Sequence, residues 1–191
     1  MASQDSVTIP IHKPRVQEKL FFLISGMIVS IPLTLFVYTF SDYLLSFTST
    51  VYASVLSTVL LAPFVEEFSK AYPLFYRHAE TERSIFTLGF LVGLGFGIVE
   101  LIEYVVLLQE PVLIRLPAVL FHASATSITA FGIAKKRTLP FYLVAVALHL
   151  LNNLFAVLGP VWDLTGPAVL GAAYLLSWFL YGKTQEHMIP L

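Results

Sequence analysis

The chain of 191 residues contains no cysteine, which excludes disulfide bridges, thiolate metal sites and a cysteine nucleophile. Charged residues are scarce: Asp, Glu, Lys and Arg make up 12% of the chain, whereas a soluble domain carries about 25%. The net charge of −1 leaves no basic surface for nucleic acid. Hydrophobic residues instead make up 57%, with a mean hydropathy of +0.81. This composition predicts an integral protein of the cell membrane, with the lipid bilayer as its surroundings.

Long uncharged runs dominate the chain, and a bilayer-spanning helix needs about 20 apolar residues. Four such runs contain no Asp, Glu, Lys or Arg, and two more are interrupted only by acidic residues and Lys70: in chain order, 20–41, 51–76, 84–108, 116–134, 138–162 and 164–181. Gly89, Gly93 and Gly97 predict close packing and a central place for the third helix. The predicted fold class is an all-α, polytopic bundle of about six transmembrane helices. It forms one domain, 1–191, with a polar segment at 1–19 and a short tail at 183–191.

Positive charge alternates between the loops of this predicted bundle. Every second loop, and both tails, hold basic residues: Lys13, Arg15, Lys19, Arg77, Arg83, Lys135, Lys136, Arg137 and Lys183. The opposite loops contain Arg115 as their one basic residue. The positive-inside rule therefore predicts that both termini are cytoplasmic.

The segment 62–70, Ala-Pro-Phe-Val-Glu-Glu-Phe-Ser-Lys, places charges inside an apolar run. A charge at the bilayer centre costs about 2.5–3.5 kcal/mol on insertion scales, and such residues usually serve a function. Glu66 and Lys70 are four apart on one helix face and are expected to pair, whereas Glu67 points about 100° away. Pro63 is expected to loosen the helix and free backbone groups near the acidic pair. The competing interpretation is a purely structural ion pair.

Three other helices each carry a titratable residue in mid-segment: Glu100, His122 and His149. Asn153 follows His149 by four residues and shares its helix face. At about 1.5 Å of rise per residue, Glu66, His122 and His149 lie at similar depth from the predicted cytoplasmic ends. We therefore expect one polar site where four helices meet. Interhelical hydrogen bonds that only hold the bundle together are the alternative.

These residues form four ordered blocks between Ala62 and Asn153, about half of the chain. The blocks are Glu66-Glu67-x-x-Lys70, Phe96-x-x-x-Glu100, the lone His122, and His149-x-x-x-Asn153. In this order, each on its own apolar helix, they resemble the PrsW-type intramembrane proteases, within the superfamily of type II CAAX prenyl endopeptidases. One departure is Leu101, where such proteins often carry asparagine. The CAAX enzymes typically have histidine where Glu100 stands, so a membrane-spanning substrate is favoured over a prenylated one.

The resemblance implies hydrolysis of peptide bonds in or near the bilayer, acting on single-pass membrane proteins such as membrane-anchored anti-sigma factors. Its implied catalytic residues are Glu66, Glu67, Glu100, His122, His149 and Asn153, with Lys70 in support. The superfamily also contains a non-catalytic scaffold relative, so the fold alone does not establish activity. A scaffold and an ion-coupled transporter therefore remain alternatives, although no inverted repeat supports a transporter.

Two chemical routes are compatible with these residues. In the first, Glu66 or Glu67 acts as general base for water, His122 assists proton transfer, and His149 with Asn153 stabilises the oxyanion. In the second, zinc is held by ligands from separate helices, with Glu67, Glu100, His122 and His149 as candidates. The residue spacing does not require a metal, and the superfamily resemblance points to glutamate, so the metal-free route is favoured. No cofactor is assigned, and zinc is the alternative.

Overall fold

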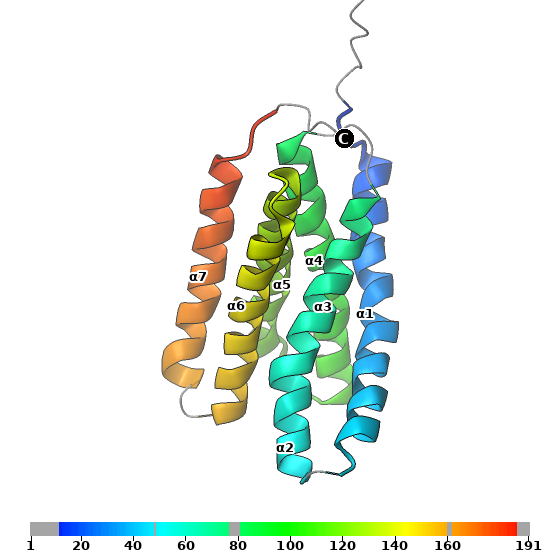
Figure 1. Ribbon diagram of the computed structural model, residues 1–191, viewed down its shortest axis with the longest axis vertical. Helices are drawn as coiled ribbons and strands as arrows, with labels where there is room; N and C mark the ends of the chain where they lie inside the picture. Colours follow the sequence, from blue (N-terminus) through cyan, green and yellow to red (C-terminus); the bar gives the residue numbers. More distant parts are fainter. Residues whose placement is uncertain (1–11, 48, 77–80, 160–161, 187–191) are drawn as a thin grey trace, which may run out of the picture.

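The computed structural model describes residues 12–47, 49–76, 81–159 and 162–186. The regular elements of this part are helices: α1 (Val16–Leu45), α2 (Thr50–Val55), the π-helix η1 (Leu56–Leu61), α3 (Ala62–Ala71), the 3₁₀-helix η2 (Tyr72–Phe75), α4 (Glu82–Leu107), α5 (Val112–Ala134), α6 (Thr138–Leu158) and α7 (Trp162–Gly182) (Figure 1). The all-α prediction is confirmed. The predicted span 51–76 is one interrupted helix, α2 to η2. Of the expected tails and inner loops, residues 1–11, Arg77 and residues 187–191 lie outside the described residues.

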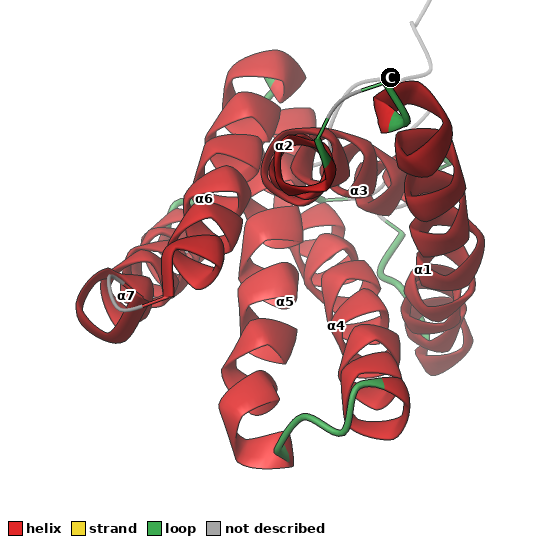
Figure 2. Cartoon of the chain, turned by 90° about the horizontal axis from the view of Figure 1, so that it is seen from below, coloured by secondary structure: helices red, strands yellow, loops and turns green. Residues whose placement is uncertain are grey.

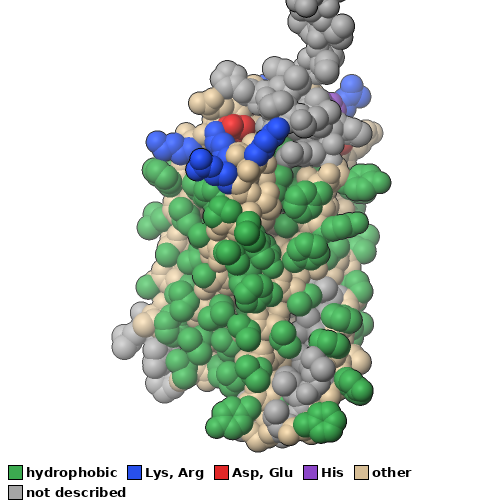
Figure 3. Space-filling view, in the orientation of Figure 1, with side chains coloured by type: hydrophobic (Ala, Val, Ile, Leu, Met, Phe, Trp, Pro, Cys, Tyr) green, Lys and Arg blue, Asp and Glu red, His purple; other side chains and the backbone are tan. Residues whose placement is uncertain are grey.

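Apolar side chains cover the outer surface of the bundle, and charged side chains gather near one end of the face shown in Figure 3. Such an exterior is unsuited to water and suited to lipid. Within the described residues, three helices are long and apolar enough to cross a membrane: α4, α5 and α6. The number of six spans stays a prediction.

Both described ends of the chain lie at the same end of the bundle (Figure 1). Lys13 Nζ lies 3.6 Å from Glu186 Oε2, and the backbone N–H of Arg83 donates to the carbonyl of Gln185. This arrangement agrees with an even number of crossings. The predicted cytoplasmic side of the termini is a separate matter and stays a prediction.

The helix α4 packs closely against α5 and α1, as its glycine spacing predicted, whereas the more central of the long helices is α5. A Cβ built at Gly93 would lie 2.3 Å from the carbonyl oxygen of His122 on α5. A Cβ at Gly95 would lie 2.0 Å from the carbonyl oxygen of Leu23 on α1. Only glycine allows backbones to approach this closely. The helices α5 and α1 therefore lie close to the α4 backbone, on different faces of α4.

The interrupted helix bears out the prediction for Pro63. In η1 each backbone N–H bonds to the carbonyl five residues earlier, and the N–H of Ala62 bonds in this way to the carbonyl of Ser57. The next bond in this pattern would join residue 63 to the carbonyl of Thr58, but Pro63 has no N–H. The side chain of Asn153 on α6 donates to that carbonyl at 2.9 Å. A neighbouring helix therefore satisfies the backbone group that proline leaves free.

Seen from the end of the bundle, α3 lies between α6 and α1, and α4 and α5 lie along the remaining side of α3 (Figure 2). The four helices predicted to carry the polar site, α3 to α6, therefore meet in one region. The helix α7 packs against α5 and α6 and contributes no residue to that region.

Candidate active site

Six side chains from four helices converge inside the bundle and form what we call the acid–histidine cluster. Its members are Glu66, Glu67 and Lys70 from α3, Glu100 from α4, His122 from α5 and His149 from α6. Glu67 and Lys70 are fully buried, the histidine side chains are 3% exposed, and Glu66 and Glu100 are 15% and 19% exposed. The structure thus brings together the expected site residues except Asn153.

Lys70 pairs with Glu67 rather than chiefly with Glu66, which corrects the sequence-based expectation. Lys70 Nζ lies 2.6 Å from Glu67 Oε1 and 3.9 Å from Glu66 Oε2. Residues three apart on a helix are neighbours as much as residues four apart, and the side-chain packing selects the nearer carboxylate. Glu66 is consequently the less engaged of the two glutamates.

His149 bridges the two glutamates. Its Nδ1 lies 2.8 Å from Glu67 Oε1, and its Nε2 lies 3.8 Å from Glu66 Oε2. Because an ionised carboxylate only accepts hydrogen bonds, Nδ1 carries the proton and donates it to Glu67. In the neutral imidazole, the lone pair of Nε2 is then directed toward the Glu66 side of the cluster. A carboxylate behind the imidazole is the usual arrangement for a metal-binding or catalytic histidine.

His122 lies between a cation and an anion. Lys70 Nζ is 2.9 Å from its Nδ1, and Glu100 Oε2 contacts its Nε2. A charged lysine can only donate, so Nδ1 accepts and Nε2 donates to Glu100. The rings of His122 and His149 are 5.2 Å apart between centroids, which places both imidazoles in one site.

Aromatic rings enclose these polar groups. The Phe96 ring lies 4.5 Å from Lys70 Nζ and 5.1 Å from the His122 ring. The Phe121 ring contacts both His122 and His149, with centroids 5.7 and 5.5 Å away. A ring face near an ammonium is favourable. The sequence marked Phe96 through the Phe96-x-x-x-Glu100 block but gave Phe121 no role. The only sequence signal for Phe121 is its position next to His122.

Arg115 lies on α5 and reaches the cluster, whereas the sequence placed it in a loop. Because α5 begins at Val112, the predicted start of this helix at residue 116 is wrong. Arg115 Nη2 lies 3.6 Å from Glu100 Oε1, and the guanidinium stacks 3.4 Å above the centroid of the Tyr104 ring. Ion pairing and stacking make the charge tolerable within the helix.

Asn153 does not join the cluster through any contact that the structure shows. Its Nδ2 donates to the Thr58 carbonyl, and its Oδ1 accepts from Asn152 at 3.2 Å. The oxyanion role expected for Asn153 therefore stays a prediction, whereas a contact with the backbone of η1 is observed.

The cluster contains a group that could hold a metal ion: single ligand atoms of Glu66, His122 and His149 lie within 4.8 Å of one another. The sequence instead named Glu67 and Glu100 beside the two histidines. Glu67 is engaged by Lys70 and His149, while Glu66 Oε2 is buried with no hydrogen-bond partner among the described residues. The 3.8 Å between Glu66 Oε2 and His149 Nε2 is shorter than two zinc–ligand bonds of about 2.0–2.2 Å, as two ligands of one ion require. The positions of Glu66 and His149 therefore fit a metal, whereas His122 would have to exchange its bond to Lys70 or to Glu100 for a bond to the ion.

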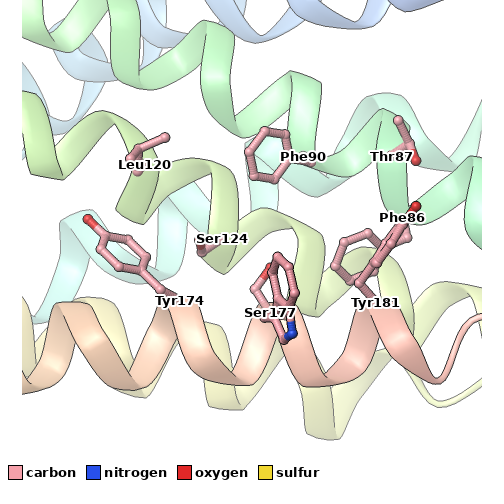
Figure 4. A pocket seen from close by; sticks show the side chains of 9 residues that line it. Phe86, Thr87, Phe90, Leu120, Ser124, Tyr174, Ser177 and Tyr181 are labelled. Atoms are coloured by element: carbon pink, nitrogen blue, oxygen red, sulfur yellow. The ribbon is translucent and has the colours of Figure 1, made fainter.

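A separate cavity of about 420 Å³ opens between α4, α5 and α7 (Figure 4). Its lining residues are Phe86, Thr87, Phe90, Leu120, Ser124, Tyr174, Ser177, Trp178 and Tyr181. Leu120 and Ser124 stand two residues before and after His122, so they point to the opposite side of α5. No member of the acid–histidine cluster lines this cavity.

Buried carboxylates and imidazoles around a gap that fits a metal ion, in a bundle with an apolar exterior, define a membrane protein with a hydrolytic type of site. The chain belongs to the PrsW family: the family profile described as PrsW family intramembrane metalloprotease matches residues 16–181. It is accordingly an integral membrane protein and a peptide hydrolase that acts on membrane proteins in the bilayer. No curated protein and no solved structure gives a significant match to the chain.

Proposed function

We propose that this chain is a zinc-dependent intramembrane endopeptidase whose metal ligands are Glu66, His122 and His149. The observation that carries this proposal is the buried Glu66 Oε2, which accepts no hydrogen bond among the described residues and faces His149 Nε2 across 3.8 Å, with Lys70 Nζ 3.9 Å away. Two acceptor atoms that face one gap repel each other unless a cation or a donor lies between them. The description of the family as metalloproteases also supports a metal ion at this site.

The remaining residues have separable roles in hydrolysis. A zinc ion bound here supplies a Lewis acid and an activated water. Glu67 holds His149 in the tautomer that leaves Nε2 free, and Lys70 neutralises Glu67. We assign proton transfer to Glu100: it takes the proton of the attacking water and returns it to the leaving amine as the peptide C–N bond breaks.

The proposed substrates are single-pass membrane proteins, of which a membrane-anchored anti-sigma factor is the example that the family resemblance suggests. We further propose that the protein crosses the cell membrane six times with both termini in the cytoplasm. The apolar exterior and the shared end of the described termini support an even number of crossings, and the distribution of basic residues supports the cytoplasmic side.

Metal analysis of the purified protein, combined with cleavage of a single-pass test substrate in proteoliposomes, tests the proposal. We expect about one zinc per chain, loss of cleavage after chelation and recovery on adding zinc. Cleavage that persists in metal-free protein contradicts the zinc-dependent route.

Metal-free hydrolysis is the second candidate, and the hydrogen bonds of His122 favour it. Both nitrogens of His122 are already engaged, by Lys70 and by Glu100, so the ring needs no metal to complete its contacts. In this route Glu66 Oε2 is the base that takes the proton from water. Glu66→Gln stops cleavage in either route, but it removes bound zinc only in the first.

A further inference from the structure

The polar side chains on one face of α6 contact the interrupted helix that carries Glu66 and Glu67. Tyr142, Val146, His149 and Asn153 follow one another at spacings of four, three and four, which places them on one stripe. The Tyr142 hydroxyl donates to the Phe64 carbonyl at 2.8 Å. His149 binds Glu67 and Asn153 binds the Thr58 carbonyl, so the three polar members of the stripe all bond to α3 or η1.

The two backbone contacts of this stripe stand at different points of the interrupted helix. Asn153 holds the Thr58 carbonyl in η1, where Pro63 leaves it without a donor. Tyr142 holds the Phe64 carbonyl two residues before Glu66. A π-helical turn is rare and is frequently found at functional sites. The direction in which α3 presents its glutamates therefore depends on side chains of α6.

We propose that Tyr142 and Asn153 are positioning residues for the hydrolysis. They hold the interrupted helix on α6 in the register that places Glu66 opposite His149 Nε2 and keeps Glu67 on His149 Nδ1. This role extends the His149-x-x-x-Asn153 block by one residue, Tyr142, seven positions before the histidine. The expected effect on the rate of cleavage rests on the proposed function. The expected effect on the position of α3 rests only on the two backbone contacts.

Steady-state cleavage by the full chain in proteoliposomes tests the kinetic consequence. Because small misplacements of reacting groups cost up to about 100-fold in rate, we expect Tyr142→Phe and Asn153→Leu each to lower kcat about tenfold, with KM changed less than about twofold. Tyr174→Phe is the matched control, since it removes a tyrosine–carbonyl bond of 2.6 Å, to Pro117, between α7 and α5. Equal losses of kcat in Tyr174→Phe and Tyr142→Phe would overturn the proposal, because they would reflect general packing.

A double-mutant cycle tests the contact of Asn153 without reference to activity. Pro63→Ala restores an N–H at residue 63, which can bond to the Thr58 carbonyl in the π pattern. Asn153→Leu is therefore expected to lower Tm in the parent chain and to lower it less when Pro63→Ala is present. Equal shifts in both backgrounds contradict the assignment of Asn153 to the carbonyl that Pro63 leaves free.

Spin labels report the position of α3 directly, because the chain has no cysteine of its own. Labels at Phe68→Cys and Leu139→Cys occupy exposed positions of α3 and α6. Tyr142→Phe should broaden the distance distribution between them, whereas Tyr174→Phe should not. If the distribution stays unchanged in Tyr142→Phe, the positioning role fails even where cleavage is lost. If it broadens in a chain whose parent cleaves nothing, the positioning role stands and the proposed function fails.

Discussion

Lys70 is the residue on which the buried charges of the site depend. Its ammonium contacts Glu67 at 2.6 Å and His122 at 2.9 Å, so it joins two chains of hydrogen bonds. One continues from Glu67 to His149, and the other from His122 to Glu100. Each charged group thereby has an opposite charge or a polar ring beside it. Such compensation is what allows ionised side chains to remain inside a bilayer.

Removing that cation should destabilise the fold more than removing the whole pair. Lys70→Met leaves Glu67 buried without a counter-charge, and breaking a buried pair typically costs about 3–5 kcal/mol. The double variant Lys70→Met/Glu67→Gln removes both charges and is expected to regain most of that stability without regaining cleavage. Thermal unfolding in detergent measures the first effect and the cleavage assay the second. A double variant no more stable than Lys70→Met contradicts the pairing.

The two adjacent glutamates should differ in their effect on metal binding. Glu66→Gln removes a proposed ligand, so stoichiometric zinc should be lost together with cleavage. Glu67→Gln removes no proposed ligand but takes away the partner of His149 and the counter-charge of Lys70. Loss of a group that supports a ligand typically costs about 10–100-fold in metal affinity. Competition with a chelator of known affinity measures both effects.

Glu103→Gln is the matched control for these variants, because it alters a glutamate on α4 outside the acid–histidine cluster. It should bind zinc and cleave substrate as the parent does. If Glu103→Gln lost zinc as Glu66→Gln does, the assignment of Glu66 as a ligand would be unsupported.

At the scale of a helix, the contact between α4 and α5 carries the clearest steric prediction. The Cβ of Gly93→Ala would lie 2.3 Å from the His122 carbonyl oxygen, so α5 and its histidine would have to move. Overpacking of this kind typically costs about 1–3 kcal/mol, and the displacement of His122 should also reduce cleavage.

Gly171→Ala on α7 provides the comparison for Gly93→Ala. Its Cβ would meet nothing within 4 Å, and alanine in a helix interior is favoured over glycine by about 1 kcal/mol. Gly171→Ala should therefore unfold at the same temperature as the parent or a higher one. Equal loss of stability in the two variants would show that the α4–α5 contact is not the cause.

At the scale of the whole molecule, the orientation in the membrane can be tested with single cysteines. We expect Gln4→Cys and Gln185→Cys to resist a membrane-impermeant reagent in intact cells and to react after the membrane is opened. Gln109→Cys, exposed between α4 and α5 at the opposite end, should react from outside. Labelling of either terminal position from outside contradicts the proposed topology.

Several features of the fold and of the site can be predicted from the sequence because their physical causes are local. Apolar composition requires lipid, and the long uncharged runs must form helices, since a backbone in lipid has to satisfy its own hydrogen bonds. Charges inside those runs mark the site because their insertion is costly. Glycine spacing identifies α4 as a closely packed helix, and Pro63 identifies the break before Glu66. Each inference needs only residue types and the helical repeat.

Distances between helices, by contrast, are decided only by tertiary packing. Spacing allows Lys70 to pair with either glutamate, and the fold selects Glu67, which leaves Glu66 Oε2 facing His149. Arg115 comes within 3.6 Å of Glu100 because α5 starts earlier than its uncharged run. Helical periodicity determines which face a residue shares, but the roles of Glu66 and Glu67 are set by atoms on α5 and α6, whose approach depends on how all the helices pack together.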